Sequence, residues 1–453
     1  MHLHLGLAKT PLAELVLVYG GILFFLLSVF RKPELGLYFM VPMLPLQTVR
    51  YRIHGYPLGS LFVDIMLLGV GLGLLRRGKP MLARTELNKI LAIFAGLTYL
   101  LLWRGSFTIG APLPLWFSDP RMSDWKNYMV MPLLFLVSVS ALTTRRQMKI
   151  LLILMCASVL VLDKSFINLM SQRDMSSFSY DMRDAGAMGY AGVNGLGAFA
   201  AQFSIFLIAM AGVARKWWRP ALFVTLALTL LALMYSFSRG AYLGLCVGLL
   251  YLGVRKNRLL LVILVLFLSS WQTLVPPAVR QRVLMTRGEN GEIESSAAER
   301  LSLWDEAMQI FRGDPLFGMG FNTYGTSDHV GGYRDTHNVY VKVLVETGLV
   351  GLSVFLILLG KMHRQARLLM DEARDPFLSS LGIAFAGLMI TLAVVNFFGD
   401  RWTYLQISGY TWTLLAMVVR GRMIAADERS ADGEHDELAG PEIEAVSATL
   451  VTC

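Results

Sequence analysis

The chain has 453 residues, of which 55% are apolar and only 16% are charged, and its formal net charge is +9. In soluble globular proteins about a quarter of the residues are charged, so this composition excludes an ordinary soluble enzyme. Cys156 and Cys246 lie in apolar runs and Cys453 is the last residue, which excludes a disulfide framework or a cysteine zinc site. A positive charge suits a protein in an anionic membrane, so we expect membrane lipids, and no nucleic acid, as partners.

Apolar runs recur along the chain, and about 20 apolar residues are enough to cross a bilayer as a helix. They predict an all-α polytopic membrane protein with about 12 transmembrane helices. The count is 12 or 13, because Pro42 and Pro45 interrupt the second run. Whether the number of spans is even or odd decides the side of the N-terminus, so its orientation stays open. The runs lie near residues 12–30, 35–48, 59–75, 88–103, 128–142, 149–163, 192–213, 220–236, 240–254, 258–275, 343–360, 378–397 and 403–419.

Basic clusters occupy every second connection between these runs. By the positive-inside rule, those connections face the cytoplasm and the others face outward. The clusters are Arg31/Lys32, Arg76/Arg77/Lys79, Arg145/Arg146/Lys149, Arg215/Lys216/Arg219, Arg255/Lys256/Arg258, Lys361/Arg364/Arg367 and Arg420/Arg422.

The chain divides into N-terminal transmembrane helices (1–275), a large outer loop (276–342), C-terminal transmembrane helices (343–420) and an acidic tail (421–453). The loop is too long for a structureless connection, so we expect short helices in it. One should follow Ser296-Ala-Ala-Glu299, with Leu301, Trp304, Met308 and Phe311 on its apolar face. From Asp427 onward the tail has eight acids and one base, so we expect it to be disordered and cytoplasmic.

His337 is the first candidate for chemistry. In Arg334-Asp335-Thr336-His337-Asn338 an acid and hydrogen-bonding groups surround it, just before an apolar run. A histidine there can act as a general base, because its ordinary pKa of about 6.5 lies near neutral pH. The alternative is a histidine that is only hydrogen-bonded at the membrane interface. The other histidines considered as candidates are His54 and His329.

Arg239 is the second candidate, because it lies between two apolar runs, where an ionisable residue is costly. Its guanidinium can bind two phosphate oxygens at once; the alternative is an arginine that snorkels from a helix end. Positive charge is usually depleted on the outer side, so further bases there indicate an anionic partner such as a phosphate- or pyrophosphate-linked lipid. These bases are Arg280, Arg282, Arg287, Arg300, Arg312, Arg334, Arg121 and Lys126.

Other signals are weaker. Asp64 lies in the third apolar run. It is either a proton or ion site or a buried acid that is only hydrogen-bonded. Asp400 and Arg401 lie in a short outer turn, where they form an ion pair or reach a cavity. No outer loop has an Asp-x-Asp pair, and the chain has no Walker loop and no serine-hydrolase elbow. We therefore expect no metal and no other cofactor.

Four motifs between about residues 190 and 420 resemble the O-antigen ligase and O-antigen polymerase superfamily of bacterial envelope glycosyltransferases. The first three are Ser236–Ala241, Arg300–Trp304 and Asp314–Tyr324. The fourth is His337, followed after ten residues by Gly348, which is the spacing of the ligases. The second motif departs from the family pattern, because Trp304 stands where the family has a leucine.

The resemblance implies a GT-C-like glycosyltransferase of the Gram-negative inner membrane, with a periplasmic active site. It would transfer a glycan from undecaprenyl pyrophosphate to a hydroxyl of lipid A–core in lipopolysaccharide biosynthesis, with inversion and without metal or ATP. Carried over, His337 activates the acceptor hydroxyl, and Arg239 and Arg300 hold the pyrophosphate. The residues expected to bind the substrates are Arg334, Asp335, Asn338, Tyr340, Asn322, Tyr324, Arg121, Asp400 and Arg401.

Two alternatives stay open. O-antigen polymerases and protein O-oligosaccharyltransferases of the same superfamily share the fold and the histidine-bearing loop, and differ only in the acceptor. A lipid-linked glycan transporter would also be polytopic and basic. It would, however, show internal repeats and charges near the bilayer midplane, and neither stands out in the sequence.

Overall fold

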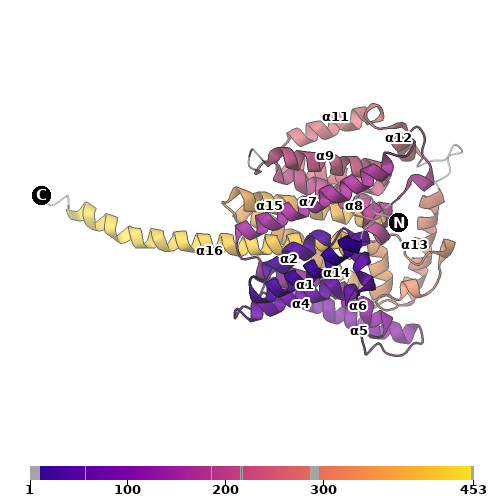
Figure 1. Ribbon diagram of the computed structural model, residues 1–453, viewed down its shortest axis with the longest axis horizontal. Helices are drawn as coiled ribbons and strands as arrows, with labels where there is room; N and C mark the ends of the chain where they lie inside the picture. The colour runs from indigo at the N-terminus through magenta and orange to yellow at the C-terminus, as the bar shows by residue number, and fades with distance from the viewer. Residues whose placement is uncertain are drawn as a thin grey trace.

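The computed structural model describes residues 11–56, 58–184, 186–214, 216, 218–285 and 295–449. Within these residues the regular structure is helical, and no strand is present. The long helices lie side by side in one bundle (Figure 1). They are α1 (Pro11–Phe30), α4 (Phe62–Leu75), α5 (Asn88–Thr108), α6 (Pro120–Ala141), α7 (Arg145–Met170), α8 (Gly192–Met210), α9 (Arg219–Tyr235), α10 (Arg239–Arg255), α11 (Leu259–Leu274), α14 (Val339–Glu372), α15 (Pro376–Val395) and α16 (Leu405–Thr449).

Each predicted apolar run except the second coincides with one long helix. The second run is divided into α2 (Glu34–Met40), η1 (Val41–Met43) and the start of α3 (Gln47–Tyr51), because Pro42 and Pro45 cannot continue an α-helix. Among the described residues, α5, α7, α8, α14 and α15 are long and apolar enough to cross a membrane, and the bent pair of α11 and α12 would make a sixth span. The count of about 12 spans therefore stays a prediction.

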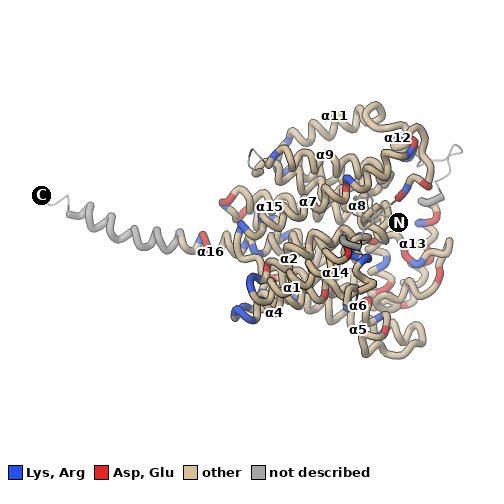
Figure 2. The backbone as a smooth tube through the Cα atoms, in the orientation of Figure 1, with Lys and Arg blue, Asp and Glu red and all other residues tan. Residues whose placement is uncertain are grey.

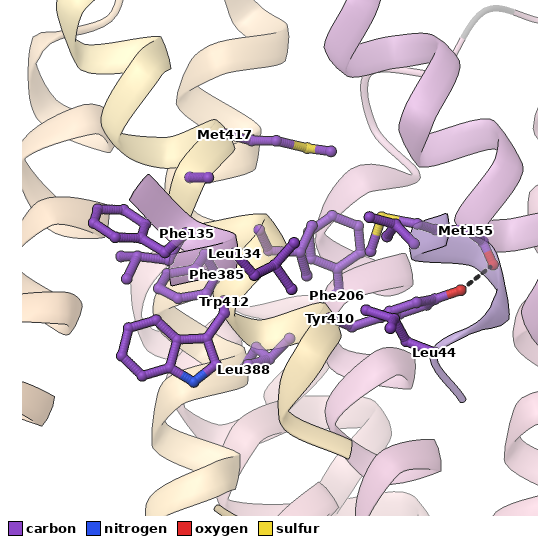
Figure 3. Packing of buried hydrophobic residues seen from close by; sticks show 14 of the residues in the cluster. Leu44, Leu134, Phe135, Met155, Phe206, Phe385, Leu388, Tyr410, Trp412 and Met417 are labelled. Carbon is purple, nitrogen blue, oxygen red and sulfur yellow. Dashed lines mark hydrogen bonds between the residues drawn. The ribbon is translucent and has the colours of Figure 1, made fainter. Parts of the chain in front are cut away.

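The core is an apolar layer in which helices from both halves of the chain meet. Figure 3 shows Phe206 of α8, Phe385 of α15 and Trp412 of α16 in this layer, all of them almost fully buried. The hydroxyl of Tyr410 donates to the carbonyl oxygen of Met155 at 3.4 Å, so its polar atom is also engaged there. Close packing of this kind drives helix association where no water is present.

The segment 276–342 forms short helices at one end of the bundle, as its length predicted. These are α12 (Pro277–Leu284), α13 (Ser295–Gly313), η6 (Tyr324–Thr326) and η7 (Val330–Gly332), and α13 stands across the ends of the long helices (Figure 1). The turn η2 (Arg52–Gly55) and the turn η3 (Gly59–Leu61) follow α3, η4 (Tyr180–Met182) and η5 (Gly186–Ala191) precede α8, and η8 (Asn396–Phe398) follows α15.

The inward face of α13 differs from the predicted one by one residue. Leu301 is exposed, whereas Leu303 and Ala307 are fully buried. Trp304 and Met308 lie beside them, half-buried. The buried positions are spaced by three or four residues, which is one face of a helix, and Leu301 is rotated away from that face.

Charged residues gather at the two ends of the bundle, and the middle is almost free of them (Figure 2). At the end opposite α13, basic residues pair with the acids around the connection from α14 to α15. Arg145 lies 3.7 Å from Asp375, and Arg422 lies 3.3 Å from Glu372. The structure thus brings basic clusters that are far apart in the sequence to the same end.

The acidic tail belongs to the last helix. α16 runs from Leu405 to Thr449 and leaves the bundle at the end opposite α13 (Figure 1), and the expectation of a disordered cytoplasmic tail stays a prediction. Its composition is rich in alanine and glutamate, which favour a helix even where no core is available. Within the described contacts, Arg145 pairs with Glu428, and Arg429 lies 3.4 Å from Glu372.

Candidate active site

The loop that follows α13 is fixed by its backbone between α5 and α14. The amides of Met319 and Gly320 donate to the carbonyl oxygens of Val345 and Glu346 at 3.0 and 2.9 Å. The backbone of Gly320 also lies directly on Gly105 of α5, where a Cβ at residue 320 would come within 2.2 Å of the Gly105 Cα. The third motif therefore has a structural reason, since only glycine allows this approach.

Glu346 and Gly348 complete this attachment from the side of α14. The carboxylate of Glu346 is buried and accepts hydrogen bonds from the amides of Asn322 and Tyr324, at 3.1 and 3.2 Å. Gly348 has a φ of 64°, which interrupts the helix, and a Cβ there would lie 2.2 Å from the carbonyl oxygen of Leu316. The glycine of the fourth motif is thus the point at which α14 turns against the loop.

His337 stands immediately before α14 in a strained backbone conformation. Its φ is 53°, in the left-handed region that non-glycine residues rarely adopt. Asn338 caps the helix after it, because its side-chain oxygen accepts from the amides of Tyr340 and Val341 at 3.0 and 3.3 Å. The strain is therefore held in place by the capped helix. Residues held in this way cluster at functional sites.

The other described non-glycine residues with a positive φ are Leu58, Phe237 and Asn322. Phe237 lies in the first motif and Asn322 lies in the third. Three of the four strained residues thus fall in motifs that the sequence had singled out.

Charged groups of both signs surround the imidazole of His337. Its Nδ1 lies 3.7 Å from Oδ2 of Asp335, and 36% of the side chain is exposed. Burial lowers the pKa of His337 below its ordinary value, and the positive charges of Arg300 and Arg401 lower it further against the opposing effect of Asp335. The ring is therefore neutral near pH 7, as a general base must be.

Polar contacts hold α13, which carries Arg300, against the segment that carries His337. The indole Nε1 of Trp304 donates to the carbonyl oxygen of Thr336 at 3.0 Å. The hydroxyl of Tyr333 donates to Glu299 at 3.1 Å, and the Tyr333 ring meets the His337 ring edge-on at 5.0 Å. Trp304, which departs from the family pattern, thus ties the helix of Arg300 to the residue before His337.

His329 has a structural place. Its Nδ1 lies 2.7 Å from Glu306 of α13, and its Nε2 lies 2.7 Å from the carbonyl oxygen of Tyr324. Its ring stacks on the Tyr324 ring with 3.9 Å between the centroids. These contacts join α13 to the loop, which leaves His337 as the candidate histidine of the four motifs.

Arg239 is the first residue of α10, and this helix end reaches the same region through η8. A Cβ on Gly240 would lie 2.5 Å from the Phe398 ring, so the start of α10 packs on that side chain. The carbonyl oxygen of Phe398 accepts from the guanidinium of Arg401 at 3.5 Å. Arg401 is one of the charges that act on His337, which links the end of α10 to the histidine.

The family model described as O-antigen ligase matches residues 224–356. The resemblance to the O-antigen ligase superfamily is therefore confirmed. The matched segment contains Arg239, Arg300 and His337 but ends before Arg401. No curated protein matches the chain significantly.

Other residues expected to bind substrates are engaged within the protein. Arg334 pairs with Asp328 at 2.7 Å, and its side chain is 67% exposed. Tyr340 donates from its hydroxyl to the carbonyl oxygen of Ala393 at 2.8 Å. Arg121 lies on α6, where it binds Asp119 at 2.7 Å, Ser106 at 2.8 Å and the carbonyl of Pro112 at 2.6 Å. Their substrate roles stay predictions, and these contacts explain each residue without a substrate.

Asp400 holds the turn that carries Arg401. Its carboxylate accepts from the amides of Trp402 and Thr403, both at 3.0 Å, and lies 3.2 Å from Nζ of Lys342. Burial favours the neutral acid, but the Lys342 ammonium and these hydrogen bonds bring the pKa of Asp400 below its ordinary value. Asp400 is therefore an anionic anchor for the turn.

Lys342 and Glu346 were not among the expected site residues, although both lie within the fourth motif. They stand one helical turn apart on α14, and each fixes a different segment at the site. A charged pair spaced by four residues in the otherwise apolar first part of this helix was the available signal. Within the described chain, no group of three His, Cys, Asp or Glu side chains is placed to hold a metal ion.

Proposed function

We propose that the protein is an O-antigen ligase, which transfers a glycan from undecaprenyl pyrophosphate to a sugar hydroxyl of lipid A–core. The reaction would take place at the periplasmic face of the inner membrane of a Gram-negative bacterium, as a step of lipopolysaccharide biosynthesis. The end of the bundle that carries α13 would then face the periplasm. The opposite end, with its basic clusters, would face the cytoplasm, as the positive-inside rule requires.

The observation that carries this proposal is the position of His337. A partly exposed imidazole with a lowered pKa lies next to Asp335 and within the field of Arg300 and Arg401. A base beside fixed positive charge suits the attack of a hydroxyl on a donor with an anionic leaving group. The domain match independently supports a reaction of this superfamily.

In the proposed reaction, the oxygen of the acceptor hydroxyl attacks the anomeric carbon of the donor sugar. The bond from that carbon to the pyrophosphate oxygen breaks, and the hydroxyl proton passes to His337. Undecaprenyl pyrophosphate leaves with the bonding electron pair, and its negative charge is stabilised by Arg300 and by Arg239 at the N-terminus of α10. A single displacement inverts the anomeric centre, and no step requires a metal ion or a nucleotide.

The test is a transfer assay with purified protein, undecaprenyl-pyrophosphate-linked glycan and lipid A–core, without metal or nucleotide. We expect a joined product with the wild-type protein. His337→Ala should lose transfer by at least about 100-fold, the low end for loss of a general base, and should still bind the donor. His363→Ala, which removes an imidazole from α14 far from this site, is the matched control and should stay within a few-fold of the wild type.

The same assay separates the related activities. Product formed only with lipid A–core supports the ligase. Product formed by joining two lipid-linked glycans would instead identify a polymerase, and transfer to the serine or threonine hydroxyls of a protein would identify an O-oligosaccharyltransferase. Retained transfer by His337→Ala would contradict the role proposed for this histidine.

A further inference from the structure

A cavity lies beside the candidate active site and was not anticipated from the sequence. It is an open cleft with a volume of about 470 Å³, and its walls come from both halves of the chain. The N-terminal half contributes α3, η2, α4 and α6, and the C-terminal half contributes Phe321, Asn322, Lys342 and the start of α16. Pockets for small molecules occupy about 300–1,000 Å³, so this cleft has the size of a ligand site.

The lining of the cleft is rich in groups that bind hydroxyls. Asp124 and Asn127 lie one turn apart on α6, and both are exposed into the cleft. Asn322 donates from its side-chain amide to Asp124 at 3.1 Å. The rings of Tyr51 and His54 also line the cleft and lie against each other, with 4.3 Å between their centroids. Such a lining suits a saccharide. Carboxylates and amides can bind the hydroxyls of a sugar, and flat rings can cover its apolar face.

The charges of the cleft do not suit a pyrophosphate. Asp64 and Asp124 both face it, and of the two cations that line it, Arg50 donates from its guanidinium to the carbonyl oxygen of Leu44 at 3.0 Å. The ammonium of Lys342 is in turn paired with Asp400 at 3.2 Å. The polar lining equally disfavours a lipid chain, because these groups would lose their hydration without new partners. A ligand with many neutral hydroxyls fits both conditions.

The cleft and the candidate active site share one turn of the chain. Thr403 lines the cleft and donates from its hydroxyl to Asp400 at 2.7 Å. Arg401, two residues earlier, acts on His337 from the other side of this turn. A sugar in the cleft would thus lie next to the turn that carries Arg401.

We propose that this cleft binds a saccharide portion of one of the two substrates, with Asp124, Asn127 and Asn322 as hydrogen-bonding residues. The proposal deepens the proposed transferase function and rests on it for the identity of the saccharide. The donor glycan and the acceptor core offer the same chemistry, so the experiment has an arm for each.

The experiment measures binding of two lipid-free probes to the purified full-length protein: delipidated core oligosaccharide and the delipidated donor glycan. Asn127→Trp fills the cleft with a bulky ring, and Asn127→Ala removes only the amide. We expect the tryptophan variant to lose affinity for one probe by at least about tenfold and the alanine variant to lose several-fold. The KM for the corresponding substrate should rise by the same factors, with kcat within about threefold.

Asn168→Trp is the matched control, because Asn168 is an exposed amide on α7 outside the cleft, and it should leave both affinities unchanged. Loss of the core oligosaccharide assigns the cleft to the acceptor, and loss of the glycan assigns it to the donor. Unchanged affinity for both probes in both Asn127 variants would overturn the proposal. Binding does not depend on turnover, so a wild-type protein that binds but does not transfer would count against the proposed function alone.

Discussion

Replacement of Gly348 by alanine tests whether the spacing from His337 to this glycine is required by the architecture. Gly348 is the point at which α14 departs from helical geometry, with a φ of 64°. The amides of Leu349 and Val350 then donate back to the carbonyl oxygens of Pro315 and Leu316, at 2.9 and 3.2 Å. The break in the helix and the attachment of the loop are thus the same feature.

The expected cost has two parts. With a ψ of −168°, Gly348 lies in a region of backbone conformation that is essentially restricted to glycine, and holding a residue with a Cβ there costs about 1–3 kcal/mol. The new methyl group would also lie 2.2 Å from the carbonyl oxygen of Leu316 and 2.5 Å from the amide nitrogen of Phe317, and backbone atoms cannot rotate away. Overpacking of this kind typically costs about 1–3 kcal/mol. Gly348→Ala should therefore lower the free energy of unfolding by about 2–6 kcal/mol.

The measurement combines denaturant unfolding in mixed micelles with the transfer assay under conditions in which the variant is folded. The matched control is Gly360→Ala on the same helix, where an added Cβ meets no atom within 4 Å; helix propensity predicts a gain of up to about 1 kcal/mol. Displacement of the loop should also reduce transfer, by about 100-fold if the site moves by about 1 Å. If Gly348→Ala matched Gly360→Ala in both stability and transfer, the structural reason given for this glycine would be refuted.

Three further predictions concern the site and the tail. Asp335 raises the pKa of His337, so Asp335→Asn should move the acidic limb of the kcat/KM profile to lower pH; a shift to higher pH would show another role for Asp335. Arg239→Lys should lose most transfer, because an ammonium cannot bind two phosphate oxygens as a planar guanidinium does, and near-normal turnover would identify a snorkelling arginine. Truncation after Ala431 removes none of the contacts described for α16 and should leave transfer within a few-fold. Truncation after Met423 also removes the ion pairs of Glu428 and Arg429, which are worth less than about 1 kcal/mol each at the surface, and a complete loss of transfer in either well-expressed protein would show a function for the tail.

The helical class and the positions of the long helices could be predicted from the sequence because they depend on local hydropathy. The interruption of the second apolar run by Pro42 and Pro45 is equally local, and the structure contains it. The state of the acidic tail stays a prediction, since low hydrophobicity excludes a packed core but does not exclude a helix. The residues that form the buried face of α13 could not be predicted fully, because they depend on what the helix packs against, namely Thr336 and Tyr324.

The site could be predicted in part. Arg300, Asp335 and Arg401 were candidates because of their charge, and the structure places all three charges around His337. Tyr340, Tyr324 and Asn338 were candidates because of their motifs, but their observed contacts are a hydrogen bond to Ala393, a stack on His329 and a helix cap. A motif shows that a residue type is needed, and only contacts distinguish a residue that touches a substrate from one that holds the loop.

The interval between His337 and Gly348 leads to a last prediction. The helix between them carries Lys342 toward Asp400 and Glu346 toward the amides of Asn322 and Tyr324. One inserted residue rotates everything beyond it by about 100° and moves it by about 1.5 Å along the helix. After insertion of an alanine between Leu344 and Val345, only one of the two contacts can therefore be kept. Either Lys342 stays at Asp400 and Glu346 turns away from the loop, or Glu346 stays at the loop and Lys342 turns away from Asp400. We expect transfer to be lost while the protein still inserts into the membrane, and an alanine inserted after Ala431 is the control. Near-normal transfer after the first insertion would mean that the distance between histidine and glycine does not set the geometry of the site.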